Sequence, residues 1–287
     1  MLFKPPRESG PARTPNRCYN RKALVTLARM PQTEQQLRQN IVRIGRMMSE
    51  KGWIAACDGN LSARLSDDRI LITPAGVCKG LLSEEDAIVC SLDGTKIQGN
   101  GKPSSEMHMH LTIYRMRGDV NAVVHAHPPT CTGFAAAGRD LNIGLLPEVI
   151  VGLGSVPLAA YGTPGTPALG ESLLPYIERH DAVLLANHGA VAWGAELMQA
   201  FFRMETAEHF ARIALVAELL GGARALPRRE IEKLFAARER YGVKSRTRFE
   251  PGNPLAAEDL PDASEKIQMT REQLLALIDE ALKVRGV

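Results

Sequence analysis

Histidine side chains are the best candidates for chemistry in this chain, because imidazole binds metal ions and exchanges protons near neutral pH. His125 and His127 stand two residues apart at the end of an apolar run, and two prolines follow them. Alternate residues of a strand point to the same face, so the Cα atoms of this pair would lie about 6.6 Å apart. Two imidazoles at that separation can bind one cation at Zn–N distances of about 2.0–2.1 Å. The spacing therefore predicts part of a metal site at the end of a strand.

A third histidine also follows an apolar run, within Asn187-His188-Gly189. Three histidines with an open fourth position are typical of catalytic zinc sites, whereas structural zinc sites are closed. A His-x-His pair alone is weak evidence, since half-buried histidines often bind backbone carbonyls, but a histidine at a second strand end strengthens it. His108 and His110 are competing ligands. Residues two apart on a helix point to different faces, so we expect His110 to pack in the core or to support the site.

A carboxylate precedes the histidine pair, at Glu106. Close to a metal, a carboxylate can be a ligand or a general base that takes a proton from an activated carbon. An acidic residue in the first turn of a helix is explained equally well by its attraction to the helix dipole. The residue type and spacing alone leave both interpretations open.

Three short stretches have the composition of anion-binding loops. Glycine lets the backbone approach a ligand, while N–H groups, hydroxyls and helix N-termini bind negative charge. Each stretch taken singly is also explained as an ordinary turn or helix cap, but their joint occurrence before the histidines indicates a phosphorylated substrate. The stretches are Asp58-Gly59-Asn60-Leu61-Ser62, Thr73-Pro74-Ala75-Gly76 and Ser104-Ser105.

Alternating helices and strands must position these residues. Apolar spacing predicts helices over residues 33–52, 105–117, 130–137, 169–180, 195–220 and 228–241. Residue alternation and turn signals predict strands over residues 61–65, 69–73, 87–92, 95–98, 120–127, 149–153, 156–158 and 182–186. The interleaving implies one α/β or α+β domain over residues 33–244. We expect residues 1–32 to be a basic, disordered extension, and residues 245–287 to be a linker with a short amphipathic helix at 270–284.

Composition excludes several classes of protein. The 287 residues are 45% apolar and 23% charged, which suits a globular core. The first 30 residues carry a net charge of +6, whereas the whole chain carries +3, so the remaining body is mildly acidic at −3 and carries no footprint for nucleic acid. No apolar run is long enough for a transmembrane helix, and no membrane partner is expected. Five widely spaced cysteines without a CxxC pair, and no signal-peptide pattern, predict reduced thiols in a cytoplasmic protein.

The motifs together resemble those of the class II aldolase/adducin family, and within it those of the fuculose-phosphate aldolase type. The resemblance covers residues 33–244, nearly the whole predicted domain. Five motifs in register make it specific for the family but not for a substrate. They are Gly59-Asn60-Leu61-Ser62, Thr73-Pro74-Ala75-Gly76, Pro103-Ser104-Ser105-Glu106, His125-Ala126-His127 and Asn187-His188-Gly189.

The resemblance implies a three-layer α/β/α domain with a central, mostly antiparallel sheet. It also implies a zinc-dependent homotetramer with active sites between subunits and a phosphorylated sugar as substrate. Glu106 would be the general acid/base, and Tyr241 would reach a neighbouring subunit's site to protonate the leaving aldehyde. The zinc ligands would be His125, His127 and His188, and the phosphate ligands would be Gly59, Asn60, Gly76, Ser104 and Ser105.

Two positions depart from the fuculose-phosphate pattern. Ala75 stands where that type has a threonine, so only a backbone donor remains there. The fuculose-phosphate type also has a second tyrosine, and Glu148 is the nearest match to it in this sequence, so a carboxylate stands in place of a phenol. Both changes bear on the sugar that is bound, so the aldehyde half of the substrate is left open.

The predicted activity is cleavage of a ketose 1-phosphate into dihydroxyacetone phosphate and an aldehyde, with zinc stabilising the enediolate and Glu106 moving its proton. The same chemistry serves other enzymes of the family: a phosphosugar 4-epimerase, a methylthioribulose-phosphate dehydratase or a sugar-acid-phosphate decarboxylase. An adducin-like assembly module is a non-catalytic alternative, which would lack the complete set of three histidines and Glu106. A zinc hydrolase is a further alternative, but it would need no anion-binding loops.

Overall fold

The computed structural model describes residues 32–243 and 246–247 of the chain. The predicted basic extension, most of the predicted linker and the predicted helix at 270–284 lie outside the described residues. The unit that begins at Glu34 is built on one eight-stranded sheet with the order β4-β3-β2-β1-β5-β8-β7-β6. All neighbouring strands are antiparallel except β6 and β7, which are parallel. The prediction of a mostly antiparallel sheet is confirmed.

The elements follow one another as helices interleaved with short strands. The strands are β1 (Asn60–Arg64), β2 (Arg69–Ile72), β3 (Ile88–Ser91), β4 (Lys96–Gln98), β5 (Ala122–Ala126), β6 (Leu158–Ala159), β7 (Ala182–Leu185) and β8 (Gly189–Gly194). The helices are α1 (Glu34–Glu50), α2 (Met107–Met116), α3 (Pro129–Ala136), α4 (Pro147–Gly152), α5 (Pro167–Glu171), α6 (Leu174–Ile177), α7 (Leu197–Leu219) and α8 (Arg228–Ala237). Three short 3₁₀ helices are η2 (Lys79–Leu81), η3 (Glu84–Asp86) and η4 (Arg238–Tyr241).

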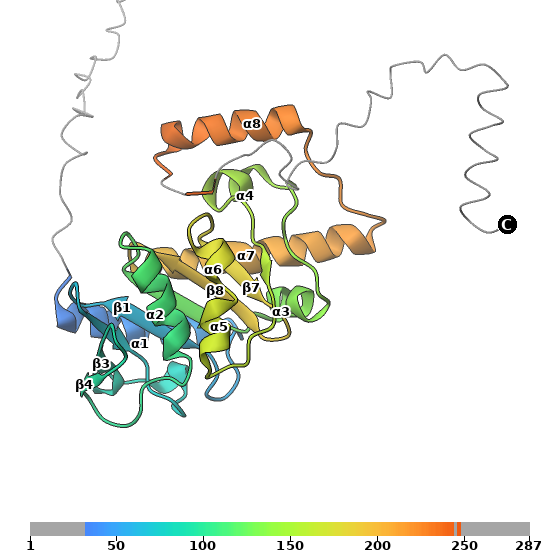
Figure 1. Ribbon diagram of the computed structural model, residues 1–287. Coiled ribbons are helices and arrows are strands. Elements are labelled where there is room, and N and C mark those ends of the chain that lie inside the picture. Colours follow the sequence, from blue (N-terminus) through green and yellow to red (C-terminus); the bar gives the residue numbers. More distant parts are fainter. Residues whose placement is uncertain (1–31, 244–245, 248–287) are drawn as a thin grey trace, which may run out of the picture. The chain divides into compact units, whose positions relative to one another are not determined.

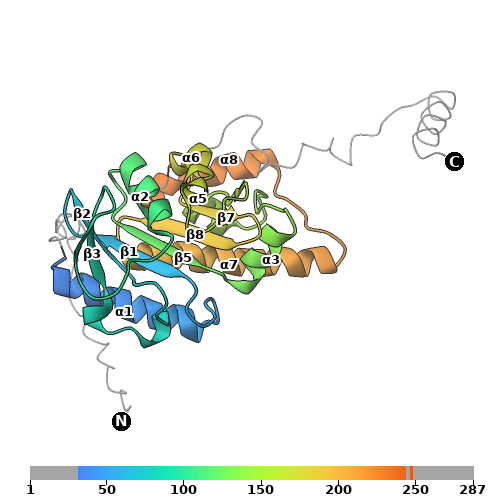
Figure 2. The same cartoon turned by 60° about the horizontal axis from the view of Figure 1, so that its bottom comes forward.

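Helices cover both faces of the sheet, which confirms the three-layer α/β/α arrangement (Figures 1 and 2). Helices α1, α3 and α7 pack on one face and α2, α5 and α6 on the other. Strand β5 shows how the sequence divides between the layers, since Val124 faces the first set of helices and Val123 the second. Helix α1 is amphipathic because its apolar residues recur every three or four positions, and Ile41, Ile44 and Met48 are fully buried.

The structure differs from the sequence prediction at three places. Residues 149–153 were expected to form a strand, but residues 149–152 belong to helix α4, where Pro147 occupies the first turn and only one side is buried. Strand β8 was not predicted, because all six of its residues are buried and so show no alternation. The helix expected over residues 169–180 is broken into α5 and α6, with Pro175 in the first turn of α6.

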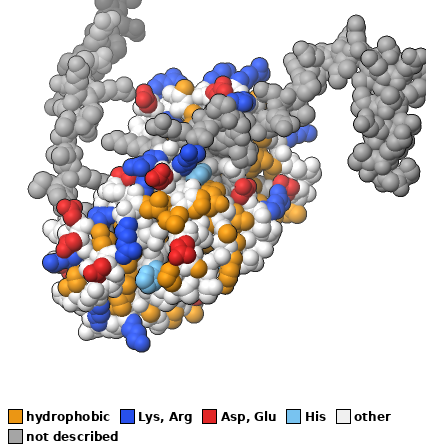
Figure 3. All heavy atoms as spheres, in the orientation of Figure 1, with side chains coloured by type: hydrophobic (Ala, Val, Ile, Leu, Met, Phe, Trp, Pro, Cys, Tyr) orange, Lys and Arg blue, Asp and Glu red, His pale blue; other side chains and the backbone are white. Residues whose placement is uncertain are grey.

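None of the helices in the described ranges is long and apolar enough to cross a bilayer. On the face drawn in Figure 3, acidic, basic and hydrophobic side chains are interspersed.

Candidate metal centre

The strand order brings the three predicted histidine ligands together. His125 lies in β5, opposite Asn60 of β1 and Val191 of β8. His127 follows the end of β5, and His188 lies in the turn between β7 and β8. Because β5 and β8 are neighbours, the rings meet with centroids 4.7–5.0 Å apart. One nitrogen from each ring lies within 4.8 Å of the others, which is close enough to bind a single ion.

The backbone of the β7–β8 turn requires the residues that flank His188. Asn187 adopts a left-handed conformation with φ of +57°, which asparagine tolerates better than most residues. A Cβ at position 189 would lie 2.5 Å from the Ala126 carbonyl oxygen and 2.6 Å from Cδ2 of His127. Only glycine therefore allows this turn to approach the end of β5. The Asn-His-Gly sequence is thus a device for placing the third ring.

The nitrogen atoms of the cluster suit a divalent cation. His125 Nδ1 lies 2.9 Å from the Ala190 carbonyl oxygen and donates to it, so Nε2 is the ring atom that faces the cluster. There it meets His127 Nε2 at 3.2 Å. Burial, together with the charges of His125 and His188, lowers the pKa of His127 to about 4. A divalent cation binds neutral imidazoles whose lone pairs converge, and three ring nitrogens this close together can supply them, so the residues present fit the ion that the sequence predicts.

Glu106 lies at the centre of this cluster. It immediately precedes helix α2, its side chain is buried, and Oε2 lies 3.1 Å from His125 Nε2 while Oε1 lies 3.1 Å from His188 Nε2. Burial raises the pKa of Glu106, but the charge of His125 and hydrogen bonds from the two histidines and Asn60 outweigh it and hold the pKa well below its ordinary value. The carboxylate is ionised and faces the histidine rings. Attraction to the dipole of helix α2 alone would not explain these contacts.

A buried chain of hydrogen bonds holds the carboxylate in place. Asn60 Nδ2 donates to Glu106 Oε2 at 2.7 Å, and Asn60 Oδ1 accepts from His110 Nε2 at 2.5 Å. His110 Nδ1 lies 2.7 Å from Ser62 Oγ, which lies 2.8 Å from the Tyr114 hydroxyl. An amide oxygen only accepts, so the proton of His110 is on Nε2, and each hydroxyl donates toward Glu106.

The members of this chain are neutral. Burial lowers the pKa of His110 to about 3 and raises the pKa of Tyr114. His110 therefore supports Glu106 through Asn60 and does not compete for a metal, while His108 is exposed. The side-chain amide of Asn60, predicted as a phosphate ligand, is directed at Glu106 and His110.

The three predicted anion-binding stretches (residues 58–62, 73–76 and 104–105) lie side by side. Thr73 N donates to the Leu61 carbonyl at 3.0 Å, and Ser104 N donates to the Thr73 carbonyl at 3.1 Å. Thr73 Oγ1 also accepts from Leu61 N at 3.1 Å, and Ala75 N donates to the Lys102 carbonyl at 2.9 Å. These bonds hold the predicted phosphate ligands next to the segment of the chain that carries Glu106.

Glycine is required at two points in these loops. Gly59 and Gly76 have φ of +69° and +70°. A Cβ on Gly59 would lie 2.9 Å from the His125 carbonyl oxygen, so this loop touches the strand that carries the metal ligands. Gly76 and Ser105 are exposed, whereas the Ser104 hydroxyl is buried and accepts from Glu106 N at 3.3 Å.

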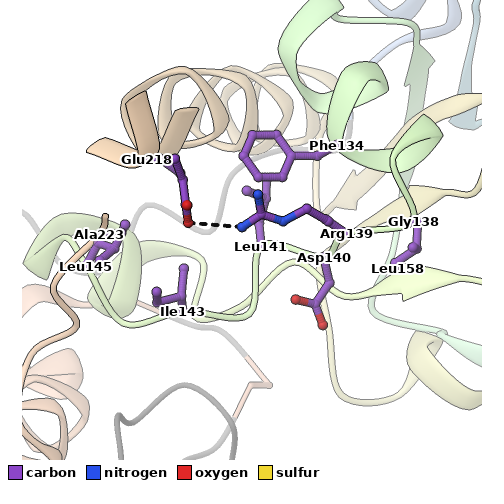
Figure 4. Close-up of a pocket in the computed structure, with 11 residues that line it drawn as sticks. Phe134, Gly138, Arg139, Asp140, Leu141, Ile143, Leu145, Leu158, Glu218 and Ala223 are labelled. Atoms are coloured by element: carbon purple, nitrogen blue, oxygen red, sulfur yellow. Dashed lines mark hydrogen bonds and ion pairs between the residues drawn. The ribbon is translucent and has the colours of Figure 1, made fainter. Parts of the chain in front are cut away.

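Two other predicted residues lie apart from the cluster. Tyr241 ends η4 and is 71% exposed, and Glu148 is exposed in the first turn of α4. Within the described residues, neither side chain contacts the histidines. A cavity of about 540 Å³ lies near the end of α7, where Glu218 and Arg139 form an ion pair at 3.0 Å (Figure 4). It is lined by none of the predicted site residues and is not a candidate active site.

Sequence reasoning missed several supporting residues. Asp58 Oδ2 lies 3.5 Å from His127 Nδ1, where it orients the ring from the first anion-binding loop. Glu208 of α7 is buried and accepts from Thr130 N at 3.1 Å and Cys131 N at 2.8 Å, at the start of α3. A carboxylate on the apolar face of a predicted helix was the available signal for Glu208. The role of Tyr114 had no local signal, since its partner Ser62 is 52 residues away.

Comparison with known proteins agrees with this geometry. The family model of the class II aldolase and adducin N-terminal domain matches residues 39–215. The chain is a member of this family. As the sequence predicted, it is an enzyme of the class II aldolase type, a carbon–carbon lyase.

Relatives of known activity share about a third of their residues with this class II aldolase. It is 37% identical over 188 residues to the 3-oxo-tetronate 4-phosphate decarboxylase of Pectobacterium atrosepticum, covering 64% of this chain and 86% of that protein. It is 35% identical over 209 residues to the 5-deoxy-D-ribulose 1-phosphate aldolase of Bacillus thuringiensis, covering 72% of this chain and 98% of that protein. A solved structure of L-fuculose 1-phosphate aldolase superposes with a TM-score of 0.66 at 31% identity, covering 72% and 96%.

Proposed function

We propose that this protein is a zinc-dependent aldolase that cleaves a ketose 1-phosphate, such as L-fuculose 1-phosphate, into dihydroxyacetone phosphate and an aldehyde. The observation that carries the proposal is the position of Glu106, whose two oxygens lie 3.1 Å from ring nitrogens of His125 and His188. An ionised carboxylate beside a three-histidine cluster is suited to move a proton at a carbon whose neighbouring oxygens are held by a cation.

The residues divide into three tasks. Bound to His125, His127 and His188, zinc would supply Lewis-acid stabilisation of negative charge that develops on the substrate oxygens. The anion-binding loops would hold the phosphate through Gly59, Asn60, Gly76, Ser104 and Ser105, which orients the sugar and adds binding energy remote from the reacting bond. The proximity of these loops to Glu106 supports this division.

Proton transfer falls to Glu106 and Tyr241. Glu106 would return a proton to the carbon that becomes the hydroxymethyl carbon of dihydroxyacetone phosphate, and would take it in the synthetic direction. Asn60 and His110 would hold the carboxylate at one orientation during this exchange. Tyr241, which is 71% exposed, would serve the aldehyde oxygen in the site of a neighbouring subunit.

We further propose a homotetramer in the cytoplasm, with a catalytic domain over residues 33–244. The exposure of Tyr241 away from its own histidine cluster supports a shared site, because the phenol has a task only if another subunit brings a substrate to it. Cys57, Cys78, Cys90 and Cys131 are free thiols, which suits a reducing compartment. A native mass of four chains would support the assembly.

Decarboxylation of a 3-oxo sugar-acid phosphate is the second candidate. The relative named 3-oxo-tetronate 4-phosphate decarboxylase is 37% identical, and the region of Glu148 offers no second phenol. Loss of CO₂ from such an acid leaves dihydroxyacetone phosphate, as aldol cleavage does. The two reactions therefore differ only in the fragment that departs, an aldehyde or CO₂.

The deciding experiment measures both fragments. The zinc-loaded protein is incubated with L-fuculose 1-phosphate, with 5-deoxy-D-ribulose 1-phosphate and with 3-oxo-tetronate 4-phosphate. Dihydroxyacetone phosphate is detected by its reduction with NADH and a coupling dehydrogenase, and aldehyde and CO₂ are measured separately. We expect dihydroxyacetone phosphate with aldehyde from a ketose 1-phosphate. Release with CO₂ alone would replace the aldolase by the decarboxylase, and no release from any of the three would shift the weight to an epimerase or a dehydratase.

A further inference from the structure

Lys79 is a buried lysine for which the reaction described above has no task. It opens η2, is only 2% exposed, and forms no ion pair with any carboxylate of the described residues. Its ammonium donates to the Cys57 carbonyl at 2.6 Å and to the Val77 carbonyl at 2.8 Å. Burying a charge among neutral acceptors is costly, so a lysine at such a position calls for an explanation.

The two carbonyls adjoin two of the anion-binding loops. Cys57 directly precedes the loop of residues 58–62, and Val77 directly follows the loop of residues 73–76. By donating to both, Lys79 links these two loops, which the Thr73 hydrogen bonds also join. The backbone of Lys79 packs directly on helix α1, since a Cβ at Gly45 would lie 2.4 Å from the Lys79 carbonyl oxygen. Glycine there lets η2 rest directly on α1.

The charge of Lys79 has no full counterion in this part of the protein. Burial lowers the pKa of Lys79, although Cys57, Asp58, Cys78 and Glu106 act to raise it. Asp58 faces His127 at 3.5 Å, and Glu106 faces two histidines, so both carboxylates have other cationic partners when those rings or a metal are charged. An ammonium has three N–H donors, and two are used by the carbonyls. A positive charge and one donor thus remain between the two loops.

We propose that Lys79 is the positioning residue of the phosphate subsite: it fixes the spacing of loops 58–62 and 73–76 and supplies the positive charge that selects a phosphate dianion. The inference rests on the proposed function, in which the substrate is phosphorylated. It adds a charged group to a subsite whose other predicted members, Gly59, Asn60, Gly76, Ser104 and Ser105, are all neutral. Neutral N–H and hydroxyl donors bind many anions, whereas a buried ammonium favours the doubly charged one.

The test compares Lys79→Met and Lys79→Gln with wild type. Binding of inorganic phosphate to the full-length, metal-free protein is measured by calorimetry at constant ionic strength, so that phosphate cannot bind through zinc. We expect both variants to bind phosphate at least about tenfold more weakly, since methionine keeps the stem, glutamine keeps a donor, and both lack the charge. Lys233→Met, which removes an exposed lysine from α8, is the matched control and should bind phosphate as wild type does.

Kinetics separate a positioning role from a merely structural one. In the zinc-loaded enzyme, Lys79→Met should raise KM for the ketose 1-phosphate about tenfold and change kcat much less, because the reacting groups are untouched. Cleavage of the same ketose without phosphate should be unchanged. Equal loss with both substrates, or unchanged phosphate binding by both variants, would overturn the role of Lys79. Failure of wild type itself to bind phosphate would instead contradict the phosphorylated substrate of the proposed function.

Wild-type protein provides a test that does not depend on whether the variants fold. With ¹⁵N-labelled lysine, the buried ammonium of Lys79 should exchange its protons slowly enough to give an NMR signal, unlike exposed lysines. This signal should shift as inorganic phosphate is added. An unchanged signal while phosphate binds would overturn the proposal.

Discussion

The two sides of the site differ in how their polar groups are held. The polar partners of Glu106 all come from its own chain: His125, His188, Asn60 and the hydrogen bonds that run from Asn60 through His110 to Tyr114. On the other side, Tyr241 is 71% exposed and Glu148 is exposed. The difference teaches that one chain by itself assembles the groups to which the proposed function assigns metal binding and proton transfer. In that proposal, the part that recognises the aldehyde would depend on a neighbouring subunit or on the substrate.

Removing a metal ligand should have the largest effect, because it destroys the self-contained side. We expect His127→Ala to lose the bound metal and all measurable activity, while wild type holds close to one zinc per chain. Elemental analysis of both proteins after zinc reconstitution checks this. His108→Ala, at an exposed histidine of α2, is the control and should keep its metal. Full metal content in the His127→Ala protein would remove this residue from the ligand set.

Neutralising Glu106 should separate metal binding from proton transfer. We expect Glu106→Gln to keep its zinc but to lose about 10²–10⁴-fold in exchange of the α-proton of dihydroxyacetone phosphate. Exchange is followed by NMR in deuterated water. Glu171→Gln, at an exposed carboxylate that ends α5, should exchange normally. Unchanged exchange in the Glu106→Gln protein would take this residue out of the acid/base role.

Removing the Tyr241 hydroxyl tests whether the exposed side is completed by a neighbour. We expect Tyr241→Phe to lower kcat by about 10²-fold, at the low end of acid–base contributions, with unchanged zinc content and thermal stability. Hybrids assembled from Glu106→Gln and Tyr241→Phe chains should regain part of the activity, because some of their sites contain both native groups. Hybrids as inactive as their parents would contradict a shared site.

Breaking the support of Glu106 should give a smaller loss. His110→Phe removes the donor to Asn60 Oδ1, so the amide is free to turn and the carboxylate loses one fixed partner. We expect kcat to fall about tenfold with zinc content unchanged, since a hydrogen bond of this kind contributes about 1–3 kcal/mol. Tyr114→Phe, one step further from Glu106, should cost less. A larger loss from Tyr114→Phe than from His110→Phe would contradict the order of the chain.

Local patterns were enough to predict the three histidines that the structure brings together, His125, His127 and His188. The His125–His127 spacing places two rings on one face, and Asn187-His188-Gly189 marks a turn, so the residue types themselves carry the geometry. Amphipathic helix α1 and the β3–β4 hairpin followed from periodicity and from Asp93-Gly94 in the same way. These features are determined by residues close together in the sequence, so they can be predicted from the sequence alone.

Non-local contacts were not predictable in the same way. Strand β8 is buried on both faces and lacks alternation, so the centre of the sheet gave a weak signal. The valines and isoleucine of α4 resemble a strand until the packing of that segment is known. Asn60 has the residue type of a phosphate ligand, and only the position of His110, 50 residues away, shows where its amide is used.

The β7–β8 turn has a consequence for the order in which the molecule folds. Strand β8 lies between β5 and β7, so His188 reaches His125 only after β8 has paired with a strand about 65 residues earlier in the chain. Pairing across that distance is slow compared with hairpin formation, because a long loop must close first. We therefore expect tight metal binding during refolding to follow the pairing of β8 with β5, because the third histidine joins the other two only then. A chelator added early should leave the rate of helix formation unchanged.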